Sequence, residues 1–401
     1  MASTTGHPMM QRIPRGVWAL GFVSLFMDVS SEMIHALLPV FLVTVLGASV
    51  TAVGFLEGIA EATASITKVF SGIWSDRVGR RKWLVVAGYG LAALTKPLFA
   101  TAPTAAWVFA ARFADRIGKG IRGAPRDALI ADLTPPAVRG ASFGLRQTLD
   151  TVGAFAGPLL AIALMTITAN EFRTVFWIAV VPASVAVALL ILFVKEPERA
   201  RTQAPRARTP LRGLGAKYWW LVLVAALFTL ARFSEAFLVL EASNAGLSAA
   251  WVPIVLVVMN VAYSFSAYPA GWLSDRVNRW AVLGVGSALL IVADLMLAAS
   301  DSLFVVMLAI AVWGLHMGFT QGLFAALVAD AAAADRRGTA FGVFYFVSGL
   351  ALLAASVAAG VIWDAFGSAA TFLTGAAVTA LAGATALVLY AAGQLGGRPA
   401  H

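Results

Sequence analysis

The chain has 401 residues, of which 60% are hydrophobic and 12% are charged, and it contains no cysteine. Soluble domains are only about half apolar, so this composition excludes an ordinary water-soluble protein and predicts an integral membrane protein. The lack of cysteine excludes disulfides, thiolate metal sites and thiol catalysis. The net charge of +9 is explained by membrane orientation, and we expect no nucleic-acid partner.

Long apolar segments separated by short polar breaks follow one another along the chain, and each is about long enough to cross a roughly 30 Å hydrocarbon layer as a helix. They predict an all-α membrane protein with twelve transmembrane helices. We expect these spans at residues 16–45, 51–74, 82–101, 104–131, 140–168, 173–194, 218–242, 250–274, 280–299, 303–330, 338–363 and 370–392.

The first predicted span places Asp28, Glu32 and His35 on one helix face by their i, i+4, i+7 spacing. The second span does the same with Glu57, Glu61 and Lys68. A charge inside a membrane span is costly unless it faces a polar interior, so we expect these faces to line a cavity.

The acids of this interior are candidates for proton coupling, because burial favours the neutral form of a carboxyl and nearby cations favour the charged form. Glu32 is the first candidate, since it lies deep in its span with His35 three residues on. The full predicted set is Glu32, Asp28, Glu61, His35 and Asp150. A permanent ion pair of Glu32 with Arg116 or Lys119 is the structural alternative.

A sequence repeat begins in the loop after the second span. "GIWSDRVGRRK" from Gly72 returns as "GWLSDRVNRW" from Gly271, 199 residues later. "ADLTPPAVRGASFG", ending at Gly144, returns as "ADAAAADRRGTAFG", ending at Gly342, at an offset of 198. Two matches at nearly one offset predict two parallel six-helix repeats, which is typical of transporters that rock one bundle against the other about a midplane site.

The repeated loop resembles the loop motif of the major facilitator superfamily. This resemblance implies two six-helix bundles and a gating role for the loop residues. The residues that carry it are Gly72, Asp76, Arg77, Gly79 and Arg80 in the first copy and Gly271, Asp275 and Arg276 in the second, where Asn278 replaces Gly79. The alternative is that this charge cluster only determines topology.

The fourth predicted span carries the stretch "DRIGKGIRGAPRD" from Asp115 to Asp127. The charged residues of this span fall within an arc of roughly 140° at 100° per residue, so one stripe of the helix is charged and cannot face lipid. They are Arg112, Asp115, Arg116, Lys119, Arg122, Arg126 and Asp127. The family's fourth-helix motif R-x-x-Q-G corresponds to Arg116 through Gly120, with Lys119 in place of the amide.

Substrate binding in this half is assigned to Arg116, Lys119, Arg122 and Arg146. A structural ion-pair network is the alternative, and we expect it for Asp115, Asp127, Arg126 and Lys68. Lys96, on the third span, is expected to extend its ammonium group to the membrane surface.

The fifth predicted span contains Gly144, Gly153, Gly157 and Pro158. They resemble the family's antiporter motif, which implies export in exchange for protons. Glycines at this spacing also let two helices approach closely, so helix packing is the alternative interpretation.

The basic segment from Lys195 to Lys217, "KEPERARTQAPRARTPLRGLGAK", divides the chain. We expect an N-terminal bundle at residues 1–194, a cytoplasmic linker at 195–217 and a C-terminal bundle at 218–401. Lys and Arg concentrate in the termini and alternate loops, so we expect both termini to be cytoplasmic. The prediction is a multi-pass protein of a bacterial cytoplasmic (inner) membrane.

The second half replaces Lys119, Arg122 and Arg126 by Met317, Thr320 and Phe324, so its side of the cavity is expected to be more apolar. Its predicted substrate-binding residues are Asn260, Tyr263, His316 and Gln321. Asp294 lies in a span expected to be peripheral, with no partner apparent from the sequence.

A pocket that is charged on one wall and apolar on the other suits an organic solute. We therefore predict a secondary active transporter of a small organic solute, working by alternating access and proton-coupled export. The alternatives are an importer of an anionic nutrient or a siderophore-like metal chelate and, more remotely, a lipid flippase or a membrane enzyme. No sequence motif for an enzyme, metal or cofactor is present; a monomer in the lipid bilayer, with the solute and protons as partners, is expected.

Overall fold

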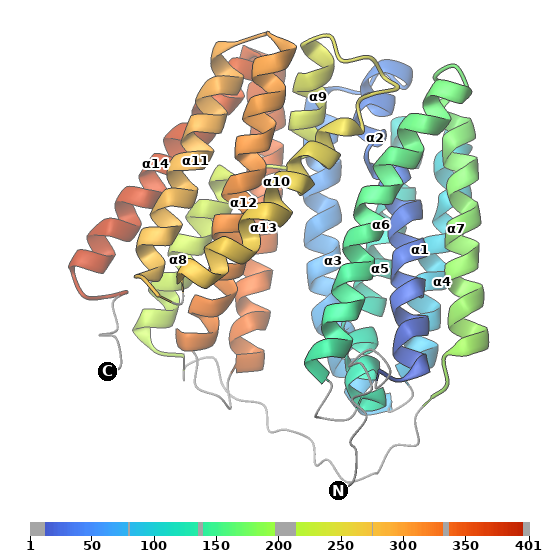
Figure 1. The fold of residues 1–401 in the computed structure, drawn as a ribbon. Coiled ribbons are helices and arrows are strands. Elements are labelled where there is room, and N and C mark those ends of the chain that lie inside the picture. Colours follow the sequence, from blue (N-terminus) through green and yellow to red (C-terminus); the bar gives the residue numbers. More distant parts are fainter. Residues whose placement is uncertain are drawn as a thin grey trace, which may run out of the picture. The chain divides into compact units, whose positions relative to one another are not determined.

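The computed structural model describes residues 13–78, 81–134, 139–196, 214–274, 276–331 and 337–395. The first half of the chain contains α1 (Arg15–His35), α2 (Leu38–Val40), the π-helical turn η2 (Phe41–Val45), α3 (Val50–Val78), α4 (Arg81–Ala100), α5 (Ala105–Leu133), α6 (Arg139–Ile167) and α7 (Phe172–Phe193). The second half contains α8 (Ala216–Ala231), α9 (Ala236–Asn244), α10 (Ile254–Ser274), α11 (Arg279–Ala299), α12 (Leu303–Ala331), α13 (Arg337–Phe366) and α14 (Ser368–Ala391) (Figure 1).

The all-α membrane fold predicted from the sequence is confirmed: each of the twelve expected spans corresponds to one long helix or to one helix with a break. Within the described residues, ten spans are long and apolar enough to cross a membrane by composition alone. The other two are α3 and α5, whose interiors carry the charges discussed above.

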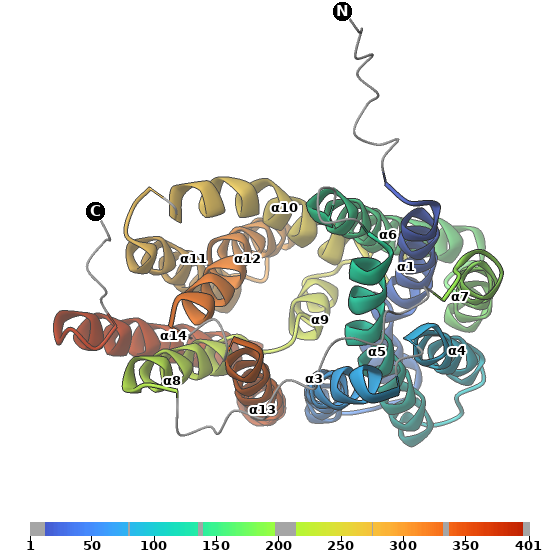
Figure 2. The same ribbon diagram turned by 90° about the horizontal axis from the view of Figure 1, so that it is seen from below.

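The chain separates by its contacts into two compact units, which we call unit 1 (Met1–His35 and Ile66–Ala204) and unit 2 (Ala36–Ser65 and Pro205–His401). In unit 1, α1 packs against α6 and α7, and α4 packs against α5 and α7, as the end-on view shows (Figure 2). In unit 2, α11 packs between α12 and α14, and α8 packs on α13 and α14.

Glycines set the closest helix contacts of unit 1. A Cβ atom on Gly88 of α4 would lie 2.7 Å from the carbonyl oxygen of Gly118 on α5, and one on Gly118 would lie 2.7 Å from the carbonyl oxygen of Gly88. No real side chain tolerates such distances, so α4 and α5 cross with their backbones in contact. This crossing brings the charged stripe of α5 against α4.

Two spans are broken at equivalent positions of the repeat. The first span is interrupted at Ala36 and Leu37, after α1, and the seventh at Arg232–Glu235, between α8 and α9. A break leaves the last carbonyls of the preceding helix without their intrahelical partners. Such helix ends are the usual sites of ion and substrate contact in transporters.

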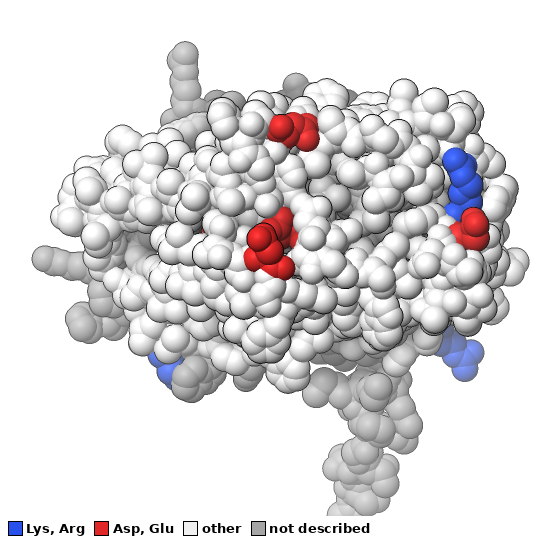
Figure 3. Space-filling view, turned by 90° about the horizontal axis from the view of Figure 1, so that it is seen from above, with Lys and Arg blue, Asp and Glu red and all other residues white. Residues whose placement is uncertain are grey.

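Figure 3 shows the face at the end of the helices opposite to the start of α1, and few charged side chains are visible on it. Large apolar side chains are instead exposed along the middle of the helices, including Leu94 of α4, Val181 of α7, Val292 of α11 and Leu381 of α14. Exposed apolar flanks of this extent fit a lipid-facing surface.

Candidate functional site

The charged stripe of α5 lies in the interior of unit 1. Arg112, Asp115, Arg116 and Arg122 are all buried, whereas Lys119 is exposed. Thr104 caps the start of this helix by accepting a hydrogen bond from the backbone N–H of Trp107. The structure therefore confirms that most of this stripe avoids lipid, and it shows how the charges are partnered.

The charges of the stripe and their partners form two clusters, and Asp115 is at the centre of the first. Its Oδ1 accepts a hydrogen bond of 2.9 Å from Lys96 Nζ, and its Oδ2 accepts two from Arg116 at 3.0 and 3.2 Å. Lys96 also donates to Ser31 Oγ on α1 at 3.0 Å. The expectation that Lys96 reaches the membrane surface is wrong: its side chain is 2% exposed and points inward, because the buried carboxylate of Asp115 needs a cation.

The second cluster lies three turns further along α5. Arg126 donates to Asp127, to Ser24 Oγ at 3.0 Å and to Tyr89 Oη at 3.3 Å. Arg146 of α6 pairs with Asp150 and lies 3.8 Å from Asp127. Most of these charges are therefore balanced by a partner within unit 1.

Arg122 lies between the two clusters and, unlike Arg116, Arg126 and Arg146, forms no salt bridge among the described residues. Its guanidinium carbon is 4.6 Å from the centre of the Tyr89 ring, which provides a cation–π contact. The residue is 5% exposed, and its Nη1 has no hydrogen-bond partner among the described residues. Arg122 can therefore donate one further hydrogen bond from Nη1.

The acids of α1 face α6. A Cβ atom on Gly153 would lie 3.0 Å from Asp28 Cβ, and one on Gly157 would lie 2.7 Å from Glu32 Cβ. Glu32 Oε2 is 3.4 Å from His35 Nδ1, and these side chains are 29% and 20% exposed. The antiporter-like glycines thus allow α6 to pack directly on the predicted proton-coupling acids, while Lys119 and Arg116 attract Glu32 electrostatically.

Other predicted residues belong to unit 2. Glu61 and Glu235 attract Arg232 electrostatically, and the guanidinium of Arg232 lies 5.8 Å from the Trp313 ring centre. His316 is buried, with Nδ1 2.8 Å from the carbonyl oxygen of Gly286 on α11. Asn260, Tyr263 and Gln321 are partly buried. Their role in substrate binding stays a prediction.

The predicted gating loop is described only in part: Gly79, Arg80 and Asp275 lie outside the described residues, as do the side chains of Asp76 and Arg77 and the surroundings of Gly144. Gly72 packs near Ala124 of α5. Gly271 is partly buried, and Arg276 is exposed. Pro158 lies inside α6.

A latch next to this loop was not anticipated from the sequence. Glu196, just after α7, accepts hydrogen bonds of 2.8 Å from the backbone N–H groups of Arg81 and Lys82 at the start of α4. Arg81 in turn donates to Asp132 near the end of α5 at 2.7 Å. A carboxylate at a helix N-terminus is favourable, so these contacts tie together the ends of α4, α5 and α7.

Tyr89, Ser24 and Ser31 are further network members that sequence reasoning missed. A signal for Tyr89 exists, because it lies seven residues, or about two helical turns, before Lys96 on the same face of α4.

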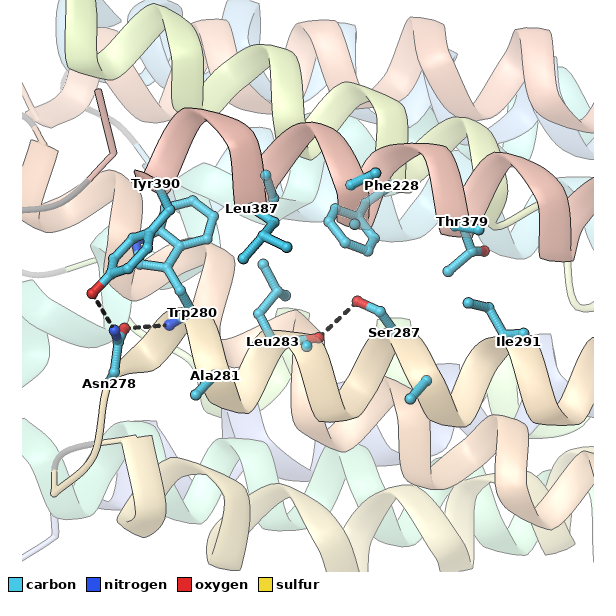
Figure 4. Close-up of a pocket in the computed structure, with 16 residues that line it drawn as sticks. Phe228, Asn278, Trp280, Ala281, Leu283, Ser287, Ile291, Thr379, Leu387 and Tyr390 are labelled. Carbon is cyan, nitrogen blue, oxygen red and sulfur yellow. Dashed lines mark hydrogen bonds between the residues drawn. The ribbon is translucent and has the colours of Figure 1, made fainter. Parts of the chain in front are cut away.

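A cavity of about 480 Å³ lies elsewhere, between α11 and α14 (Figure 4). Its walls are mostly apolar and small. The hydroxyls of Ser287 and Thr379 donate to carbonyl oxygens of their own helices, at 2.7 and 2.8 Å. None of the charged residues described above lines this cavity, so it is separate from the charge network.

Known proteins that resemble this chain have the same architecture. The sequence profile of the Major Facilitator Superfamily matches residues 20–351 and 236–396. An uncharacterised MFS-type transporter of Methanocaldococcus jannaschii is 32% identical over 381 residues, which cover 93% of this chain and 94% of that protein. Multidrug resistance protein 1 of Bacillus subtilis is 26% identical over 235 residues, covering 57% of this chain and 59% of that protein.

Among solved structures, a bacterial homologue of the human lysosomal transporter Spinster, in an inward-facing and occupied conformation, aligns with a TM-score of 0.78. The alignment covers 98% of this chain and 100% of that one at 15% sequence identity. At this identity the likeness concerns the fold.

Proposed function

Because the chain belongs to the major facilitator superfamily of membrane transporters, we propose that it is a proton-coupled exporter of a small organic solute that carries an anionic group. The observation that carries this proposal is Arg122, a buried cation whose Nη1 has no acceptor among the described residues. The orientation with cytoplasmic termini is part of the proposal and rests on the distribution of basic residues.

Arg122 is suited to bind the anionic group. Leaving a buried guanidinium N–H without an acceptor is costly. The Tyr89 ring offsets about 0.5–2 kcal/mol of this cost, and Asp28 and Asp115 attract the group electrostatically without accepting a hydrogen bond from Nη1. A carboxylate would accept the free N–H in the planar geometry that guanidinium favours. Lys119 lies three residues earlier on the same stripe and adds a second cation.

Proton coupling is assigned to Glu32 and Asp28, which α6 touches through Gly157 and Gly153. Any sliding of α6 against α1 would change how far these carboxyls are from the cations of α5 and from water. Such a change shifts the balance between their neutral and charged forms. Coupling would thus pass through the α1–α6 contact.

The direction of transport is supported by two observations. The glycines of α6 resemble the antiporter motif, and a relative of limited identity is named a multidrug resistance protein. The name of that protein supports our proposal that this chain exports an amphiphilic organic solute.

Uptake together with a proton is the second candidate, because the proposed anionic site and the proposed proton-coupling acid are different groups. An anion that neutralises Arg122 and a proton that neutralises Glu32 do not compete for the same group. Sites that fill independently can carry the anion and the proton in the same direction, as co-transport requires.

The test is transport by the purified protein in liposomes with imposed proton gradients of both signs, using a panel of carboxylate-bearing fluorescent dyes. Export predicts that dye accumulates in vesicles that are acidic inside, whereas uptake predicts accumulation in vesicles that are acidic outside. Arg122→Ala should abolish transport while the protein remains folded, and Arg122→Lys, which keeps the charge, should keep part of it. Transport at the wild-type rate by Arg122→Ala would contradict the proposal.

A further inference from the structure

Asp294 of α11 is a buried acid that the charge network does not use. It is 0% exposed, and neither of its carboxylate oxygens has a hydrogen-bond partner among the described residues. An ionised carboxylate in such a position costs several kcal/mol, so the group is expected to hold a proton in this conformation.

Gly375 of α14 leaves the space in which this carboxyl lies. A Cβ atom there would be 2.8 Å from Asp294 Oδ2, 3.1 Å from the Phe233 ring and 3.5 Å from the carbonyl oxygen of Ala231. The carboxyl therefore faces the break between α8 and α9, where Ala231 is the last residue of α8. The carbonyl of a terminal helical residue lacks its intrahelical donor.

Phe233, beside the carboxyl, belongs to an aromatic cluster. Phe233 packs against Phe237 and Phe372 with ring centres 5.2 and 5.6 Å apart, and Trp363 lies 5.7 and 5.9 Å from the same two rings. A hard metal cation needs about six oxygen ligands, which these aromatic side chains do not offer. A proton is the cation that fits.

The charged and titratable groups on the surrounding elements interact with other partners, as Glu241 of α9 does with Ser368 and Asn244. Arg232 lies over the Trp313 ring. His316 of α12 forms a hydrogen bond with the carbonyl oxygen of Gly286, which lies about two turns before Asp294 on α11. Glu235, in the break, and Tyr263 of α10 interact with Arg232. On α14, Thr371 and Thr379 flank Gly375 and donate to the carbonyl oxygens of Ala359 and Gly375.

We propose that Asp294 is a proton-binding site in unit 2, separate from the charge network of unit 1, and that its protonation controls the α8–α9 break. The carboxyl faces the Ala231 carbonyl at the end of α8, and only its protonated form can donate a hydrogen bond toward that carbonyl, so protonation stabilises the broken helix. Release of the proton to water requires the break to rearrange and hydrate the carboxylate. The role in transport rests on the proposed proton coupling, but the site itself does not.

The first experiment needs no transport. Infrared spectra of the full-length protein in lipid nanodiscs are compared with those of Asp294→Asn, which has nearly the same shape. We expect a protonated-carboxyl band at neutral pH in the wild type that Asp294→Asn lacks and Ser287→Ala, on the same helix, keeps. If the wild type and Asp294→Asn show the same band, Asp294 is not protonated and the inference is wrong.

Gly375→Ala provides a second measurement if Asp294→Asn does not accumulate in membranes. It keeps the carboxyl but crowds Oδ2, so the pH midpoint of the band should shift. An unchanged midpoint would overturn the assignment of the band to Asp294.

Transport then tests the role. Asp294→Asn should lose the pH dependence of dye transport in liposomes while it retains downhill exchange, and an unaltered pH profile would refute control of the break. If the wild type shows no proton-driven transport at all, the proposed function fails, and the infrared result still decides the site.

Discussion

The buried pair between Lys96 and Asp115 offers the sharpest test of the network, through the substitution Lys96→Met. Methionine keeps the length of the side chain but removes the ammonium that donates to Asp115 at 2.9 Å and to Ser31 at 3.0 Å. Removing one partner of a buried ion pair costs about 3–5 kcal/mol. Because Arg116 still donates to Asp115, we expect the lower end, about 3 kcal/mol.

The assay is reversible unfolding in mixed micelles, followed by circular dichroism. A double-mutant cycle with Asp115→Asn should give an interaction energy of about 1–3 kcal/mol between the two sites. Lys82→Met is the matched control, because the ammonium group of this partly exposed lysine of α4 donates to the carbonyl oxygen of Ile191 in a bond open to solvent, and its loss should change stability by less than about 0.5 kcal/mol. If Lys96→Met is as stable as Lys82→Met, the side chain does not hold the pair and reaches the membrane surface instead.

Three further predictions concern helix contacts and coupling. Gly157→Ala should destabilise the protein by about 1–3 kcal/mol and slow transport, since its methyl group would meet Glu32 Cβ at 2.7 Å, whereas Gly90→Ala, whose Cβ position is open, should leave unfolding and transport unchanged; equal effects of the two would argue against close packing of α6 on α1. Asp364→Ala should cost about 1 kcal/mol in the same unfolding assay, because within unit 2 Asp364 accepts hydrogen bonds from the backbone N–H groups of Val50 and Thr51 at the start of α3; an unchanged midpoint would mean that water replaces the cap. Glu32→Gln should remove proton-driven accumulation of dye in liposomes and keep downhill exchange, since exchange needs no net proton movement; gradient-driven accumulation at the wild-type level would assign coupling to Asp28 or another group.

The sequence alone predicted the helices and the family, because both depend on features that are local or repeated along the chain. A span must be about 20 apolar residues long, and an offset of 198–199 residues is visible without coordinates. The burial of the α5 stripe followed for the same reason: the 100° rotation per residue places Asp115, Arg116 and Arg122 on one side, and lipid excludes that side.

The partners of these charges were decided by the tertiary structure. Lys96 is an isolated cation in the sequence, and only the glycine crossing of α4 and α5 turns it toward Asp115 rather than toward the surface. The space that Asp294 occupies beside the break at Arg232–Glu235 likewise depends on Gly375, about 80 residues after Asp294 in the chain. Periodicity gives the face of a helix on which a side chain lies, but the rotation and closeness of neighbouring helices, set by packing between distant residues, determine which groups meet.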